Sequence, residues 1–227
     1  MNSFSRPRKL IAAAVLLSVL AAPVSVMAEE LQPLQLPPPR MDGGKPLMQA
    51  LQQRQSKREF SAEPLELQVL SDLLWAAFGI NRPDIDHRTA PSAMNSQEID
   101  VYVALAHGVF VYDAKAHALK PIAAGDVRTK TGGQDFVKIA PVALVFVADL
   151  ARMVKARPET KEGYAGIDTG YISQNVYLYC ASAGLATVAH ELGDRRVLGD
   201  ALQLRPDQKI ILAQTVGYPA ARRSGAK

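Results

Sequence analysis

The feature that most constrains this chain is an apolar run at residues 141–148, which reads Pro-Val-Ala-Leu-Val-Phe-Val-Ala. Its side chains do not alternate between apolar and polar, which is typical of a strand that is buried on both faces. The run therefore predicts an inner strand of a layered domain, with other elements covering each face of its sheet.

The rest of the chain supplies helices and further strands. Helical spacing of apolar residues predicts helices, and β-rich runs separated by turn residues predict strands. The expected helices cover 47–55, 64–78, 169–183 and 195–202, the expected strands cover 99–106, 109–113, 118–122, 185–189 and 209–216, and 81–95 is expected to be a loop. Because a hairpin at His107-Gly108 lies beside later helix–strand units, we expect an α+β fold with a mixed sheet.

Residues 1–28 have the pattern of a secretory signal peptide. Arg6, Arg8 and Lys9 precede an apolar run of 13 residues, and small residues ending at Ala28 follow at the spacing that signal peptidase accepts. An uncleaved membrane anchor is the alternative, but the run falls short of the roughly 20 residues that span a bilayer. We therefore expect cleavage, a periplasmic location and no membrane span in the mature chain.

The charge of the mature chain is nearly balanced. The sequence has 26 basic and 22 acidic residues, and three of the basic residues but no acidic ones lie in residues 1–28. The net charge of +4 therefore gives no support for nucleic-acid binding. Residues 29–46 contain five prolines and are expected to form an extended arm or linker before one domain at 47–227.

The sequence gives little support for hydrolytic or metal chemistry. Cys180 lies in an apolar helical stretch, which is typical of a buried thiol rather than a nucleophile. The four histidines have no metal-ligand spacing, and there is no Gly-x-Ser-x-Gly elbow, P-loop or Gly-x-Gly-x-x-Gly motif. We therefore expect neither a catalytic side chain nor a metal site.

Two segments carry groups suited to a phosphorylated ring compound. Residues 54–58 offer two guanidinium groups and a hydroxyl to a phosphate and to carbonyl oxygens, or they form a solvated basic turn. In residues 91–97, small side chains allow a flat ring to approach the backbone, and a side-chain amide can both donate to and accept from the edge of that ring. The alternative is that these residues form an ordinary loop before a strand. The candidates are Arg54, Ser56 and Arg58 in the first segment, and Pro91, Ser92, Ala93, Met94 and Asn95 in the second.

Two later segments complete the set. Backbone N–H groups between Gly184 and Ala189 are placed to face an electron-rich ring, although a simple helix stop is the alternative. Residues 217–219 read Gly-Tyr-Pro and precede Arg222 and Arg223, which can return cations to the same phosphate. The alternative for this tail is a solvated basic terminus.

The order of these motifs resembles the nitroreductase-like flavoprotein family, and within it the branch of the thiazole/oxazole-forming peptide dehydrogenases. The resemblance runs from about residue 47 to residue 219. The family's Arg-x-Ser-x-Arg-x-Phe pattern is matched by Arg54, Ser56, Arg58 and Phe60, and its Pro-Ser-x-x-Asn-x-Gln loop by Pro91, Ser92, Asn95 and Gln97. Its central helix is matched by residues 174–178, which read Gln-Asn-Val-Tyr-Leu, followed by Gly184-Leu185, and its closing turn is matched by 217–219.

The resemblance implies a layered α+β fold whose mixed sheet is mainly antiparallel, and a homodimer with FMN at its interface. In such proteins the segment of Arg54, Gln55, Ser56 and Arg58 binds the FMN phosphate, ribityl chain and pyrimidine edge. The loop at 91–95 contacts the flavin held by the other subunit. The backbone of Val188 and Ala189 lies near flavin N5, and Arg222 and Arg223 complete the phosphate site.

The resemblance also implies an FMN-dependent oxidoreductase with a ping-pong cycle, in which a donor reduces the flavin and a nitroaromatic or quinone acceptor then reoxidises it. Two alternatives remain open, which are a non-catalytic periplasmic flavin-binding protein and a peptide azoline dehydrogenase. One departure from the family concerns Glu98 and Ile99, which stand where many members have Pro-Trp, so the substrate wall is expected to differ.

Overall fold

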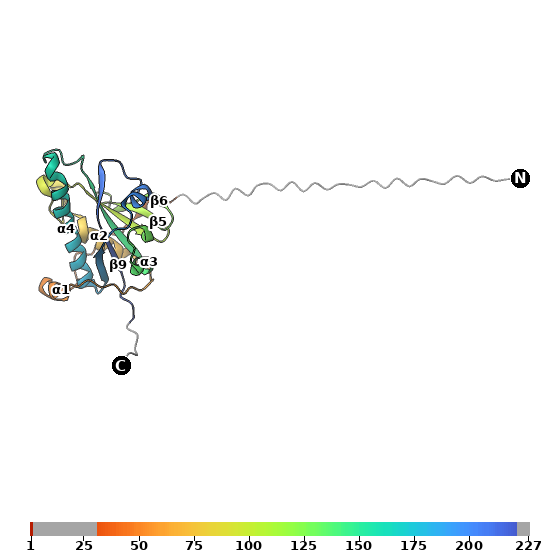
Figure 1. The fold of residues 1–227 in the computed structure, drawn as a ribbon. Coiled ribbons are helices and arrows are strands. Elements are labelled where there is room, and N and C mark those ends of the chain that lie inside the picture. Colours follow the sequence, from red (N-terminus) through yellow and green to blue (C-terminus); the bar gives the residue numbers. More distant parts are fainter. Residues whose placement is uncertain (2–30, 222–227) are drawn as a thin grey trace.

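Seven strands form one sheet in the order β1-β6-β5-β4-β7-β9-β8. Figure 1 shows the labelled strands β5, β6 and β9 of this sheet together with the helices around them. This computed structural model describes residue 1 and residues 31–221, so the predicted signal peptide, Arg222 and Arg223 lie outside the described residues. The strands are Leu34–Gln35 (β1), Ile99–Leu105 (β4), Gly108–Asp113 (β5), Ala118–Ala124 (β6), Val142–Asp149 (β7), Ala186–His190 (β8) and Gln208–Gly217 (β9). The short strands Ile80–Arg82 (β2) and His87–Arg88 (β3) pair separately, within the expected loop at 81–95.

The α+β layered fold and its mainly antiparallel sheet are confirmed, and the described part of the sheet contains no parallel pair. Each pairing between its neighbouring strands in the described chain is antiparallel. The reason is the path of the chain after β7. A long helix carries it to the far edge, where β8 forms, and β9 then returns between β7 and β8.

The predicted inner strand is β7. All eight of its residues are buried, and it pairs with β4 on one side and β9 on the other, with Leu144 opposite Val103 and Gln214. Because neighbouring side chains on a strand point to opposite faces, β7 contributes Leu144 and Phe146 to one layer of the core and Val145 to the other.

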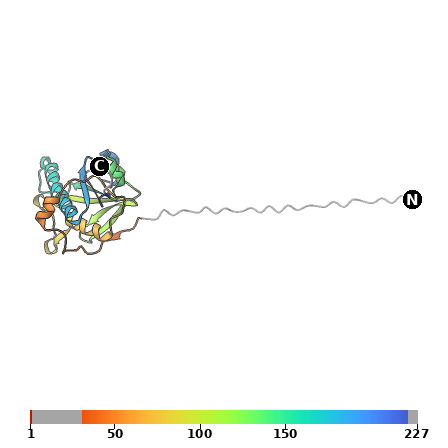
Figure 2. The ribbon, with the colours of Figure 1, turned by 90° about the horizontal axis from the view of Figure 1, so that it is seen from below.

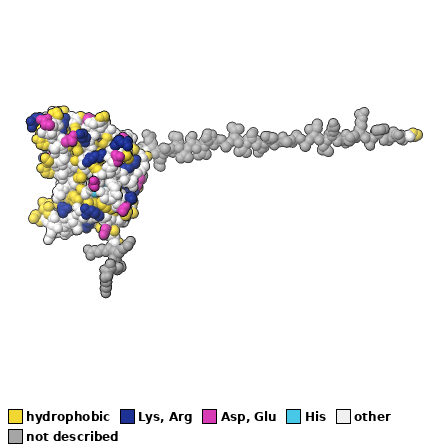
Figure 3. All heavy atoms as spheres, in the orientation of Figure 1, with side chains coloured by type: hydrophobic (Ala, Val, Ile, Leu, Met, Phe, Trp, Pro, Cys, Tyr) yellow, Lys and Arg dark blue, Asp and Glu magenta, His cyan; other side chains and the backbone are white. Residues whose placement is uncertain are grey.

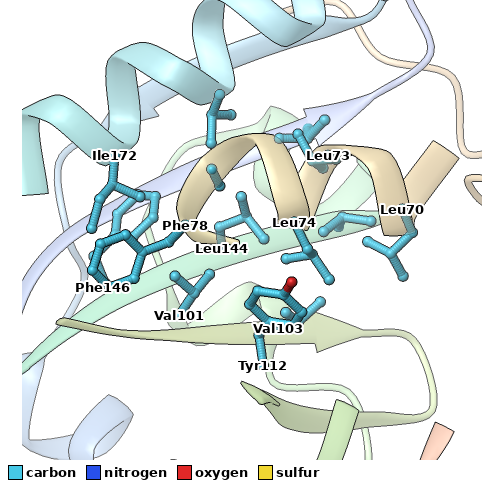
Figure 4. Close-up of a cluster of buried hydrophobic side chains, with 14 of the residues drawn as sticks. Leu70, Leu73, Leu74, Phe78, Val101, Val103, Tyr112, Leu144, Phe146 and Ile172 are labelled. Atoms are coloured by element: carbon cyan, nitrogen blue, oxygen red, sulfur yellow. The ribbon is translucent and has the colours of Figure 1, made fainter. Parts of the chain in front are cut away.

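Helices α2 (Leu67–Phe78) and α4 (Pro158–Ala183) cover the first of these faces. Figure 4 shows Leu73, Leu74 and Phe78 of α2 over the sheet, with Ile172 of α4 beside Phe146. The opposite face is covered by α5 (Arg195–Ala201), whose Leu198 is fully buried. Figure 2 shows the strands running between the two layers. Two short helices, α1 (Leu47–Gln53) and α3 (Asp135–Ile139), complete the α elements.

Helix α4 begins at Pro158, well before the start at residue 169 that the apolar spacing predicts. Its first half contains Gly163, Gly166 and Gly170, which are poor helix formers and hide the helical pattern. Pro158 occupies the first turn, where its missing N–H is not needed, and Gly184 ends the helix in the left-handed conformation. Cys180, near the end of α4, is buried as expected.

The proline-rich arm is extended and packs on its own chain. Within it, β1 adds to the sheet edge beside β6, and the Arg40 guanidinium and backbone N–H both bind the Asp72 carboxylate of α2. The carbonyl of Pro37 accepts hydrogen bonds from the Ser71 hydroxyl (2.6 Å) and the His117 ring (3.0 Å). None of the helices in the described chain has the length and apolar character of a membrane span.

Candidate functional site

The segment that follows α1 lies against the edge of the sheet. The backbone N–H of Lys57 donates to the carbonyl of Thr187 at 2.9 Å, which attaches the segment to the outer side of β8. The Ser56 hydroxyl lies 3.0 Å from the Tyr177 hydroxyl of α4, and the Arg54 guanidinium carbon lies 5.3 Å from the centre of the Tyr177 ring. The first predicted motif therefore meets α4 and β8 at one tyrosine.

The edge strand β8 reaches the same tyrosine through its backbone. The N–H of Ala189 donates to the Tyr177 hydroxyl at 2.9 Å. Val188 is buried, so its side chain belongs to the core and only its backbone reaches the edge. Both residues expected from the sequence near a flavin ring thus lie next to the segment of Arg54 and Ser56.

A cavity of about 300 Å³ opens at this junction, at the lower end of the range for small-molecule pockets. Gln55, Lys57, Tyr177 and Thr187 are among the residues that line it. Arg58 is exposed beside this segment.

A larger cavity of about 640 Å³ lies elsewhere, between α4, α5 and β9. Its cationic residues already have partners, because Lys209 pairs with Glu162, Arg196 pairs with Asp200, and Arg195 donates to the carbonyl of Ile210. We therefore assign the candidate site to the smaller cavity, which Tyr177 lines and where the Arg54–Arg58 segment meets the edge of β8.

The closing turn lies beside the first motif. Phe60 forms an isolated antiparallel bridge with Pro219, and the N–H of Ala220 donates to the carbonyl of Glu59 at 3.1 Å. The chain therefore approaches the described end next to Arg58, while Arg222 and Arg223 fall outside the described residues.

The loop at 91–97 lies against the first half of α4. The Asp168 carboxylate accepts a hydrogen bond from the backbone N–H of Ala93, and the N–H of Gln97 donates to the Ser92 hydroxyl. Met94 and Asn95 both have positive φ angles, a conformation that is strained for Met and tolerated by Asn. Such strain in an exposed loop is typical of functional segments.

The structure does not bring this loop and the first motif together within one chain. Asp168 holds the loop and Tyr177 holds the motif, and these residues are nine positions apart on α4. At a rise of 1.5 Å per residue, that spacing is about 14 Å along the helix axis. Pro91, Ser92, Ala93, Met94 and Asn95 therefore form a second surface, separate from that of Arg54, Ser56 and Ala189.

Glu98 is fully buried directly behind the loop, and neither of its carboxyl oxygens has a hydrogen-bond partner within residues 31–221. Burial, together with the nearby Asp168 carboxyl, raises the pKa of Glu98 to about 7, while Arg152 opposes the rise. The same Arg152 donates to the carbonyl of Gln97. An acid thus stands beneath the loop where the family pattern has an apolar pair.

Sequence reasoning missed Tyr177 and Asp168 as site residues. Tyr177 lies within the 174–178 stretch that matches the family's central helix, and Asp168 lies before it, but only the packing of distant segments reveals their contacts. Within the described chain, no group of three or more His, Cys, Asp or Glu side chains is arranged to hold a metal ion.

Comparison with known proteins gives consistent findings. The sequence matches the family model described as "Nitroreductase family" over residues 51–218. It is 31% identical over 153 residues to a nitroreductase-like protein of Methanocaldococcus jannaschii, a match that covers 63% of this chain and 77% of that one.

Two solved structures are also similar. A nitroreductase-like structure from Ralstonia eutropha JMP134 has 45% sequence identity and a TM-score of 0.80, and the match covers 84% of this chain and 90% of that one. A structure from Desulfovibrio desulfuricans, solved in complex with FMN, shares the fold with a TM-score of 0.56 at 22% identity, over 81% of this chain and 91% of that one.

Proposed function

The chain belongs to the nitroreductase family and is an oxidoreductase of that family, and we propose that its cofactor is FMN. The observation that carries the proposal is the meeting of the Arg54–Arg58 segment with the edge of β8 at Tyr177, beside a cavity. The FMN complex of the structural neighbour from Desulfovibrio desulfuricans supports this choice of cofactor.

The residues present fit an anionic, flat cofactor. Arg54 and Arg58 supply guanidinium groups for a phosphate, and Gln55 and Ser56 supply donors and acceptors for a hydroxylated chain and a ring edge. Ala189 presents only a methyl group, so it leaves room for a ring close to β8. Arg222 and Arg223 are proposed to add positive charge to the phosphate site.

When bound, FMN supplies the hydride chemistry, and the protein supplies position and electrostatics. Arg58 is proposed to lie near the pyrimidine edge, where its charge stabilises the negative charge of the reduced cofactor. Donor and acceptor are proposed to use the same open face in turn, which is a ping-pong cycle. The acceptor class is a nitroaromatic or a quinone, because a flat, electron-poor molecule can stack in that position.

We further propose that two copies of the chain form the complete site through α4. Ile167 and Tyr171 are about half exposed on this helix, with Gly163, Gly166 and Gly170 between and beside them. A Cβ atom added at any of the three glycines would meet no atom within 4 Å beyond its chain neighbours and the backbone of its own helix. Each glycine costs about 1 kcal/mol relative to alanine inside a helix, and close approach of a second backbone explains why they are present.

The exposed apolar surface continues onto α1, which packs against α4 and exposes Leu47 and Met48. Figure 3 shows hydrophobic side chains along the edge of the molecule where these helices lie. In a dimer formed here, the loop at 91–95 of one chain is proposed to reach the flavin held by the Arg54 segment of the other.

Titration with FMN tests the cofactor proposal. We expect the protein to show flavin absorbance, and we expect Arg54→Ala and Arg58→Ala each to weaken FMN binding by about tenfold or more, because charged hydrogen bonds to phosphate are strong. Arg196→Ala, on the opposite face of the sheet, is the matched control and should bind normally. A folded wild-type protein that ignores FMN would overturn the proposal.

The location of the protein is a further part of the proposal. The amino-terminal pattern described above supports export to the periplasm and cleavage after Ala28. Mass spectrometry of protein from a periplasmic fraction is expected to give a chain that begins at Glu29. An intact amino terminus in the cytoplasmic fraction would contradict this.

A further inference from the structure

Tyr177 connects three segments that are far apart in the sequence. Its hydroxyl contacts Ser56 of the first motif at 3.0 Å and accepts the N–H of Ala189 of β8 at 2.9 Å, while its ring lies beneath the Arg54 guanidinium. The side chain is half-buried, so the hydroxyl is held at the rim of the cavity rather than in free solvent.

The hydrogens at this junction can be counted. The Tyr177 and Ser56 hydroxyls carry one hydrogen each, and only one of the two is used in the contact between them, whichever oxygen donates. The N–H of Ala189 already donates its hydrogen bond to the Tyr177 oxygen. One hydroxyl hydrogen therefore has no acceptor in the described part of the chain.

The count also changes the role of Ala189. The Ala189 N–H points to the outer edge of β8, but it already donates its hydrogen bond to the Tyr177 hydroxyl oxygen. A ligand that lies along this edge therefore meets the Tyr177–Ser56 pair as its hydrogen donor before it meets the backbone. The Lys57 N–H to Thr187 carbonyl bond keeps the pair in register with the strand.

We propose that Tyr177 is a positioning residue of the cofactor site, which fixes Ser56 and β8 in one arrangement and leaves a single hydroxyl hydrogen for an acceptor atom of the bound flavin. This inference rests on the proposed function, because it assigns a role toward FMN. The ring of Tyr177 has a second role, since it restricts the Arg54 guanidinium to the side of the cavity through a cation–π contact.

The test is a double-mutant cycle in FMN affinity with Tyr177→Phe and Ser56→Ala, read by quenching of flavin fluorescence. Phenylalanine keeps the ring beneath Arg54 and removes only the hydroxyl. We expect each single variant to weaken binding by about three- to tenfold, the effect of one hydrogen bond, and the double variant to be little worse than either single one. Tyr179→Phe is the control, because it removes a half-buried hydroxyl from the same helix, two positions away, outside this junction.

A merely structural tyrosine predicts a different pattern. In that case Tyr177→Phe lowers the thermal midpoint, FMN affinity is unchanged at temperatures where the variant is folded, and Ser56→Ala acts independently of it. That pattern, or tighter binding by Tyr177→Phe, would overturn the inference. Failure of the cofactor proposal itself is distinguishable, because the wild-type protein would then not bind FMN at all.

Discussion

The Asp168 carboxylate in the first half of α4 accepts a hydrogen bond of 2.7 Å from the backbone N–H of Ala93. This contact fixes the start of the 93–95 turn, where Met94 and Asn95 have positive φ angles. The helix that carries the exposed glycines therefore also holds the loop that is proposed to reach the other subunit's flavin. The position of the loop and the proposed subunit contact therefore both depend on α4.

Removal of this anchor should release the loop. In Asp168→Ala we expect the amide of Ala93 to lose its protection from hydrogen exchange, and the free energy of unfolding to fall by about 1–3 kcal/mol, because a buried hydrogen bond to a charged group is lost. Asp168→Asn keeps an acceptor oxygen and should show a smaller effect. Asp135→Ala, at a highly exposed site, is the control. Unchanged exchange at Ala93 in the alanine variant would contradict the anchoring role.

The buried Glu98 predicts a stability that falls as pH rises. Its pKa is raised by burial to about 7 in the folded chain, against about 4.3 in an unfolded one. Between these values the folded state holds a proton that the unfolded state has lost, so the free energy of unfolding decreases with pH from about 4.3 to 7. Above pH 7 the ionised, unpartnered carboxylate costs about 3–4 kcal/mol.

Glu98→Gln tests this directly, since the amide cannot ionise. We expect the variant to be about 3–4 kcal/mol more stable than wild type at pH 8 and similar to it near pH 4.5, as measured by urea unfolding. Glu63→Gln, at an exposed position, should leave the pH profile unchanged. If the free energy of unfolding changes with pH in the same way for wild type and for Glu98→Gln, Glu98 does not titrate in this range.

The dimer proposal predicts that charge on the exposed face of α4 separates the subunits. Ile167→Glu places two like charges near each other in a symmetric contact, so sedimentation should show a monomer where wild type is a dimer. FMN affinity should fall with it, because the loop at 91–95 would be removed from the flavin. Val154→Glu, exposed outside α4, should leave the mass unchanged. A wild-type monomer that binds FMN would contradict the shared site.

The sequence predicted the fold well wherever a local pattern decides the structure. The apolar run at 141–148 marked β7, and Gly184 marked the end of α4. The family resemblance implied a mainly antiparallel sheet, but the residues alone did not, because the insertion of β9 between β7 and β8 depends on tertiary packing that no local pattern records. The start of α4 was missed because Gly163, Gly166 and Gly170 have low helix propensity and hide the helical pattern.

The candidate site was predicted only in part, for a related reason. Arg54 and Ser56 were found because two cations and a hydroxyl at short spacing have recognisable chemistry. Tyr177 contacts Ser56, which is 121 positions away, and Asp168 contacts Ala93, which is 75 positions away, so the neighbouring residues of the helix do not indicate these contacts. Their roles depend on which segments α4 brings together.

A last prediction concerns the arm, which His117 holds to the domain. The Nε2 of His117 lies 3.0 Å from the carbonyl of Pro37, which only accepts, so the ring donates there. Its Nδ1 lies 2.9 Å from the Tyr112 hydroxyl. Burial lowers the pKa of His117, so in acid the unfolded chain binds a proton that the folded chain resists. The free energy of unfolding should therefore fall as pH drops below about 6.5, the opposite direction to the effect of Glu98.

His117→Gln isolates this contribution, because burial also lowers the pKa of His190 and wild type contains both effects. At pH 7.5 we expect the variant to be about 1–3 kcal/mol less stable than wild type, since the ring's hydrogen bonds to the arm and to Tyr112 are lost. The difference in stability should shrink towards pH 5, where protonation of the unfolded chain has removed the stabilisation that neutral His117 gives to wild type. Faster proteolysis of residues 31–46 in the variant would locate the loss at the arm. A stability difference that stays constant between pH 5 and pH 7.5 would show that the His117 ring does not contribute through its protonation state.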